Sequence, residues 1–189
     1  ATKLGEEVEC SFTVLSLEEL MAGKLRAMLD RQHPRDLYDL YRLVRVGVPH
    51  YQGLLRRLSI LFACTLPRDL REYTLERCER VLGADTERLL YPLLRAGDRP
   101  RVGEMLELVR PVLAAVLDPA NDATAFLNAM AEGRYEPELL FPCRPDIVER
   151  VRRHPALLWK AGNVAQHLAQ AKKTHKVDAI RPRPDRQQR

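Results

Sequence analysis

The sequence of 189 residues lacks any apolar run approaching the length of a membrane-spanning helix, so we expect no association with a membrane. Its four cysteines form no Cys-x-x-Cys pair, and its five histidines show no metal-ligand spacing with them. These absences give no support to a zinc site. We expect reduced core cysteines in a cytoplasmic protein. With 46% hydrophobic and 30% charged residues, the chain is long enough for one globular domain.

The most informative stretch is residues 16–43, which begins with the pattern of a helix start. Ser16 and Glu19 have the spacing of a capping box, so a helix should begin at about Leu17. Lys24 shares one face of that helix with apolar residues at three- and four-residue spacing, namely Leu17, Leu20, Met21, Leu25 and Met28. An unpaired ammonium is costly to bury. Lys24 should therefore either reach out along the rim or meet an anion, either a carboxylate or a ligand phosphate.

A second helix should begin near Pro34, a residue that suits the first turn of a helix. Asp36 then falls in the first turn, where the helix dipole stabilises a carboxylate. Asp39 lies one turn further on, within reach of Arg35 and Arg42 at helical spacing. Because the connection between the two helices is short, they should form an antiparallel hairpin. A lysine and an aspartate would then line one cleft.

The residues of this hairpin resemble those of the AbiEii/AbiGii-type toxins, which are nucleotidyltransferase-like proteins of bacterial and archaeal toxin–antitoxin systems. In that family a helix of the form LEELxxxKLxALxxR is followed closely by RDLYDL. The matching positions here are residues 17–20, Lys24, Leu25, Ala27, Arg31 and residues 35–40. Residues 135–163, which contain PELLF and HPALLWK, are also similar to the family's C-terminal helices.

The resemblance implies roles for individual residues. Lys24 and Asp36 would belong to the active site, with Lys24 holding a nucleoside triphosphate. Apart from the resemblance, we expect Arg31, Arg35 and Asp39 to brace the hairpin, because they can form ion pairs that hold Lys24 and Asp36 in position. From the residues alone, Lys24 fits a rim position as well as a ligand-binding one, and the two aspartates fit helix-dipole and ion-pair roles. The resemblance also implies an RNA acceptor, such as the end of a tRNA, and a cognate antitoxin as a partner.

Two motifs that nucleotidyl transfer of this type requires are absent. The sequence contains no Gly-Ser pair to grip phosphate and no Asp-x-Asp triplet to chelate Mg2+. Residues 7–14 alternate apolar and polar side chains, as a half-buried strand does. We therefore expect the chain to be the C-terminal portion of a longer protein and to be inactive alone, with Mg2+ bound by residues upstream of it.

The expected fold is mainly α. It is a multi-helix C-terminal domain with one N-terminal β-strand left from a nucleotidyltransferase-like α+β domain. Residues 1–15 would hold the last strand of the truncated sheet, residues 16–171 the helical domain, and residues 172–189 a basic disordered tail. Pro92 and Pro111 should break or kink helices, and Trp159 should anchor the core. The predicted helices beyond the hairpin are residues 52–63, 73–82, 86–95, 102–117, 123–132, 145–153 and 156–172.

The positive charge is concentrated near the C-terminus. Residues 1–143 hold 19 Lys and Arg against 22 Asp and Glu, whereas residues 144–189 hold 12 against 4. The basic tail could bind RNA phosphates through its charge. The more common alternative is a solvated chain end that binds nothing. For the whole chain, the alternative to the enzyme is a non-catalytic helical interaction or RNA-binding module that retains the hairpin as a scaffold.

Overall fold

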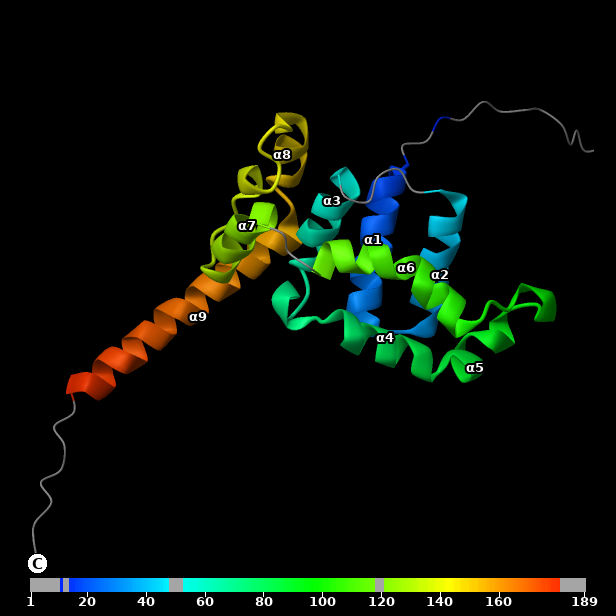
Figure 1. Ribbon diagram of the computed structural model, residues 1–189. Coiled ribbons are helices and arrows are strands. Elements are labelled where there is room, and N and C mark those ends of the chain that lie inside the picture. Colours follow the sequence, from blue (N-terminus) through cyan, green and yellow to red (C-terminus); the bar gives the residue numbers. More distant parts are fainter. Residues whose placement is uncertain (1–10, 12–13, 48–52, 118–120, 181–189) are drawn as a thin grey trace, which may run out of the picture.

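The computed structural model describes residues 11, 14–47, 53–117 and 121–180. These residues are mainly helical, as predicted, and contain no strand (Figure 1). In chain order the α-helices are α1 (Leu17–Arg31), α2 (Pro34–Val46), α3 (Leu54–Ala63), α4 (Leu75–Ala84), α5 (Thr86–Leu89), α6 (Val102–Leu117), α7 (Asn121–Ala131), α8 (Pro145–Val151) and α9 (Pro155–Ile180). Short 3-10 turns are η1 (Leu70–Glu72), η2 (Tyr91–Leu93), η3 (Ala96–Asp98) and η4 (Pro137–Leu139).

Local signals fix the start of each hairpin helix. The predicted capping box is present, because the Glu19 amide donates to Ser16 Oγ at 3.2 Å and the Ser16 amide donates to Glu19 Oε2 at 2.9 Å. Helix α1 ends at Arg31, where Gln32 adopts a left-handed backbone with φ 50°. His33 then caps α2, and Pro34 occupies its first turn. Only two residues join the helices, so α2 folds back along α1.

The core around the hairpin is built from α1, α2, α3, α4 and α6. Helix α1 packs against both α2 and α3, α6 contacts α2 and α3, and α4 packs on α6 (Figure 1). The buried face of α1 carries Met21, Ala22, Leu25, Met28 and Leu29. Each fully buried Leu or Met side chain of this kind stabilises a fold by roughly 1.5–3 kcal/mol. Leu20 departs from the predicted apolar face, since it is exposed.

Helices α7, α8 and the first part of α9 pack together beside this core (Figure 1). Gly133 ends α7 with a φ of +79°, and a Cβ there would lie 2.6 Å from the backbone nitrogen of Ala165 in α9. Only glycine fits this position, because it supplies both the left-handed backbone and the close approach.

Several expectations for the C-terminal half are wrong. The helix predicted for residues 156–172 extends to Ile180, because residues 164–180 contain no Gly or Pro and are rich in good helix formers. The tail predicted to be disordered from residue 172 is thus helical to residue 180, and residues 181–189 lie outside the described part. Trp159 is 70% exposed and not a core anchor. Leu157 is buried instead, and two residues along a helix turn a side chain to the opposite side.

The two prolines behave differently. Helix α5 ends at Leu89 and a 3-10 turn follows around Pro92, so the predicted break is present and the single helix predicted for residues 86–95 is wrong. Helix α6 instead continues through Pro111 without a break. Cys64 and Cys78 are buried as expected, whereas Cys143 is exposed.

The predicted N-terminal strand, residues 7–14, falls almost wholly outside the described residues and stays a prediction. Ser11 and Val14, the described residues of that segment, belong to no strand. Within the described part of the chain, no helix has both the length and the apolar character that a bilayer crossing requires.

Candidate functional site

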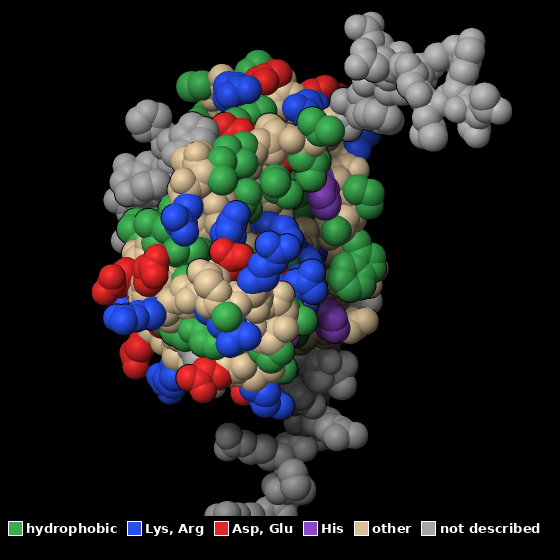
Figure 2. Space-filling model, turned by 90° about the vertical axis from the view of Figure 1, so that its right-hand side faces the viewer, with side chains coloured by type: hydrophobic (Ala, Val, Ile, Leu, Met, Phe, Trp, Pro, Cys, Tyr) green, Lys and Arg blue, Asp and Glu red, His purple; other side chains and the backbone are tan. Residues whose placement is uncertain are grey.

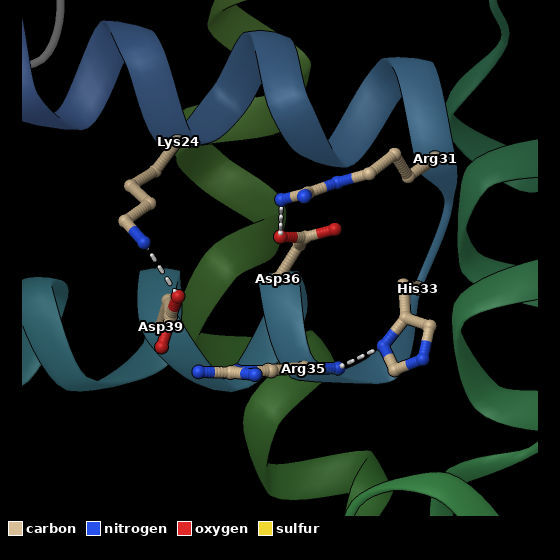
Figure 3. Close-up of a pocket in the computed structure, with 6 residues that line it drawn as sticks. All are labelled: Lys24, Arg31, His33, Arg35, Asp36 and Asp39. Carbon is tan, nitrogen blue, oxygen red and sulfur yellow. Dashed lines mark hydrogen bonds and ion pairs between the residues drawn. The ribbon is translucent and has the colours of Figure 1, made fainter.

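A pocket of about 370 Å³ opens between α1 and α2. All five residues predicted from the sequence line it, and His33 is the sixth (Figure 3). Lys24 and Arg31 come from α1, His33 comes from the connection, and α2 contributes Arg35, Asp36 and Asp39. The hairpin therefore brings the predicted site residues together.

Asp36 is the most buried charged group of the pocket, with its side chain 4% exposed. Its Oδ1 accepts a hydrogen bond from the Arg31 guanidinium at 2.5 Å. Its Oδ2 is also buried, but no described residue donates a hydrogen bond to it. Figure 3 shows this second oxygen pointing away from Lys24, towards the end of the pocket that carries His33. A buried carboxylate oxygen without a donor favours a ligand group that can supply one.

Lys24 meets a carboxylate of the same chain. Its Nζ lies 2.7 Å from Asp39 Oδ2, and the two side chains are 36% and 31% exposed. Ion pairs this accessible to water stabilise a fold by roughly 0.2–1 kcal/mol. Lys24 can therefore exchange Asp39 for a ligand anion at a small cost in stability.

Arg35 and His33 are linked through the start of α2. The Arg35 amide donates to His33 Nδ1 at 3.1 Å, so the ring's remaining hydrogen-bond donor is Nε2. The Arg35 side chain extends along α2 towards Asp39 (Figure 3). Among the described residues Arg35 forms no ion pair, so the structure does not show the ion pair that we expected of it. Arg31 does pair with Asp36, and Asp39 with Lys24. His33 was missed by the sequence reasoning, although its place just before Pro34 marks it as a capping residue.

The pocket has a small excess of positive charge, with three Lys and Arg side chains against two Asp. Such a site attracts anions. It does not suit a divalent cation, because both carboxylates already bind cationic side chains. In the described part of the chain, no group of three or more His, Cys, Asp and Glu could hold a metal ion. The described residues therefore do not fit a Mg2+ site.

A protein-family model described as nucleotidyl transferase AbiEii toxin, type IV TA system, matches residues 2–132, which is more than half of the chain and includes the hairpin. The chain belongs to the AbiEii nucleotidyltransferase toxin family. This confirms the resemblance carried by residues 17–40 and the assignment to a toxin–antitoxin system. The similarity inferred for residues 135–163 lies beyond the matched range and stays a prediction. Neither the comparison with curated proteins nor that with solved structures gave a match.

Proposed function

We propose that this AbiEii-family chain is the helical part of an enzyme that transfers a nucleotide from a nucleoside triphosphate to RNA, such as the end of a tRNA. In this proposal the triphosphate binds in the α1–α2 pocket. The observation that supports it most is the gathering of Lys24, Arg31 and Arg35 around an open pocket within the family match. Three cations at one pocket suit the charge of a triphosphate.

Each residue has a distinct part in the proposal. Lys24 leaves Asp39 and binds a phosphate oxygen, as a compact cation on a flexible stem can do. Asp36 uses its open Oδ2 to accept a hydrogen bond from a hydroxyl of the nucleotide or of the acceptor. Arg31 holds Asp36 in place, and Asp39 positions Lys24 before the ligand arrives. Arg35 adds positive charge at the mouth of the pocket.

Mg2+ belongs to the proposal as a cofactor bound outside this chain. Transfer of this kind uses the metal to neutralise phosphate charge. Since the described residues do not fit the ion, its ligands are proposed to lie upstream. A cognate antitoxin and a location in the cytoplasm follow from the same family role.

One observation favours the second candidate, a non-catalytic helical or RNA-binding module. Lys24 and Asp36 both have partners within the hairpin, which is how a purely structural hairpin is braced. Under this alternative the pocket holds no triphosphate and its charges serve only to fix α1 against α2.

A transfer assay separates these candidates. The chain alone, incubated with Mg2+, labelled nucleoside triphosphates and total RNA, should label nothing. A protein that also carries the expected upstream segment should label RNA, and Asp36→Asn should abolish the labelling while its fold is retained. Strong labelling by the chain alone would contradict the proposal that the metal ligands lie upstream. A longer protein that folds but never labels RNA would favour the module.

A further inference from the structure

A second pocket, of about 240 Å³, lies beside a neighbouring face of α2, against η3 and the start of α6. It is lined mainly by polar side chains. Its charged lining residues are Arg42, Arg45, Asp98, Arg99 and Glu104, and Tyr38 and Tyr41 add two aromatic rings. The toxin family assignment and the proposed roles of the first pocket make no use of these residues.

One wall of this second pocket is held rigidly by Tyr41. Tyr41 is buried, and its hydroxyl donates a hydrogen bond to Glu104 Oε1 at 2.5 Å. The same hydroxyl accepts a hydrogen bond from Arg45 at 3.1 Å. The Arg45 guanidinium also lies 5.5 Å from the centre of the Tyr41 ring. Glu104 therefore holds the tyrosine, and the tyrosine holds Arg45, which lines the pocket and forms no ion pair with a described carboxylate.

The opposite wall presents another arginine. Arg99 lies 5.9 Å from the centre of the Tyr91 ring, and the Tyr91 hydroxyl fixes this segment by donating to the Pro100 carbonyl at 2.8 Å. Arg42, from α2, lines the same pocket and is exposed. Among the described residues, no Asp or Glu forms an ion pair with Arg42, Arg45 or Arg99. Figure 2, which views the side of the molecule where α2 and η3 lie, shows a group of Lys and Arg side chains near the middle of this face.

The two pockets are joined along one line of α2. Arg35, Tyr38, Arg42 and Arg45 follow each other at spacings of three, four and three residues, so they share one helix face. The line is about 15 Å long at 1.5 Å per residue. It starts at Arg35 in the first pocket and ends at Arg45 in the second. Tyr38 stands within it, half-buried, with its ring 6.3 Å from that of Tyr41.

We propose that this line, together with Arg99, is a binding track for single-stranded nucleic acid that leads to the α1–α2 pocket. The arginines bind successive phosphates and a base stacks on Tyr38. Arginines interleaved with an aromatic ring suit a single strand, because its unstacked bases can reach the ring and a paired duplex keeps them inside. An acidic protein surface could bind the arginines, but it would have no base to stack on the Tyr38 ring. Only the direction of the track rests on the proposed function, since binding itself needs no transfer.

The first test compares two double variants that remove the same charge. Arg42→Gln/Arg99→Gln removes two arginines of the track. Arg134→Gln/Arg144→Gln removes two arginines beside α7 and α8, on the opposite side of the molecule from α2 (Figure 1). Binding of a fluorescein-labelled 12-nucleotide oligouridylate is measured by anisotropy at several salt concentrations. The track variant should bind about tenfold more weakly at low salt. Its slope of log K against log salt should fall by about 1.4, because each lost contact to a single strand removes about 0.7. The control should keep the original slope.

The second test examines whether a base stacks on Tyr38. Tyr38→Leu keeps an apolar side chain against the core but removes the ring, and should weaken oligouridylate binding about tenfold, which corresponds to about 1.4 kcal/mol for one stacked base. Tyr38→Phe keeps the ring and should bind as the original chain does. Both substitutions should leave the affinity for duplex RNA of the same length unchanged.

Three results would overturn the proposal. They are equal losses for the track and control variants, undiminished binding by Tyr38→Leu, and binding of polyglutamate as tight as that of the oligonucleotide. Melting curves of all variants exclude unfolding as the cause of a loss. Because these assays contain no nucleoside triphosphate, failure of the proposed transfer reaction would leave their outcome unchanged.

Discussion

The two pockets lined by α2 use their charges differently. In the α1–α2 pocket, both carboxylates are bound by cations of the hairpin, and one of these carboxylates is almost fully buried. In the second pocket, Arg45 contacts the ring and hydroxyl of Tyr41 and Arg99 contacts the ring of Tyr91, and neither forms an ion pair with a described carboxylate. Charges of the first pocket therefore contribute to stability as well as to any ligand binding. In the second pocket, Arg42 and Arg99 should contribute to binding with little effect on stability, whereas Glu104 and Arg45 also hold Tyr41.

A second contrast lies within the α1–α2 pocket itself. The Arg31–Asp36 pair has a carboxylate that is 4% exposed, whereas the Lys24–Asp39 pair is accessible to water on both sides. The stability contributed by an ion pair depends on the burial of the group left behind when its partner is removed. The four predictions that follow are ordered by their expected effect on stability, and the Lys24 test closes the argument.

The largest loss of stability is expected for Arg31→Met. This change leaves the buried Asp36 carboxylate without its cation, and we expect the free energy of unfolding to fall by about 3 kcal/mol. Urea denaturation measures this loss. The double variant Arg31→Met/Asp36→Asn removes the stranded charge as well and should regain part of it. A loss below about 1 kcal/mol for the single variant would show that water solvates Asp36 adequately.

A smaller, pH-dependent effect is expected at Tyr41 in the second pocket. The hydrogen bond to Glu104, followed by burial, raises the pKa of Tyr41 above 10.0. The unfolded chain then loses this proton first, so the stabilisation is fully present below pH 10 and is lost as the pH rises from there through the raised pKa of folded Tyr41. Tyr41→Phe should flatten the decline of melting temperature between about pH 9 and 11. Burial also raises the pKa values of Tyr73 and Tyr135, but these groups affect both proteins equally. An identical alkaline decline for both proteins would contradict the role given to Tyr41.

Arg42→Gln/Arg99→Gln should change stability least among the pocket variants. Neither side chain pairs with a described carboxylate, so the free energy of unfolding should stay within about 0.5 kcal/mol of the original. Urea denaturation checks this beside the binding assay. A loss comparable to that of Arg31→Met would erase the distinction between the two pockets.

Deleting residues 172–189 should have no effect on melting temperature. The last side chains of α9 that the structure describes, residues 165–172, are all exposed, so we expect a cut at residue 172 to remove no described core contact. The same deletion should reduce the salt dependence of RNA binding, since this tail is strongly basic. A marked fall in melting temperature would show that the tail packs on the fold. An unchanged salt slope would show that it is only a solvated end.

Local signals carried the sequence prediction where it succeeded. The capping box at Ser16 and the proline at position 34 act within one helical turn, so they could be read directly. The pairing of Lys24 with Asp39, and of Arg31 with Asp36, depends on how α1 is rotated against α2. Spacing within either helix does not determine that rotation. The sequence accordingly gave the members of the site and left their partners open.

Features that depend on distant segments were not predicted. The second pocket brings residues 38–45 against residues 97–104, and no short motif links those stretches. Trp159 was misjudged because apolar neighbours in the sequence do not reveal which side of α9 meets the core. The full length of α9 was also underestimated, since a basic composition was taken as a sign of disorder although its residues favour helix.

The central claim, that the hairpin binds a triphosphate and is more than a brace, is tested most directly by Lys24→Met beside Arg26→Met. Both substitutions remove one partly exposed ion pair from α1, since the Arg26–Asp30 pair is 38% and 37% exposed, and Arg26→Met also removes the hydrogen bond from Arg26 Nε to Thr65 Oγ1 at 2.8 Å. Lys24→Met should lower the free energy of unfolding by no more than about 1 kcal/mol, and Arg26→Met by about 1 kcal/mol or more because of the lost hydrogen bond. In the protein that carries the upstream segment, only Lys24→Met should abolish nucleotide transfer. Equal residual activity in the two variants, or a loss of activity proportional to unfolded protein, would contradict the claim.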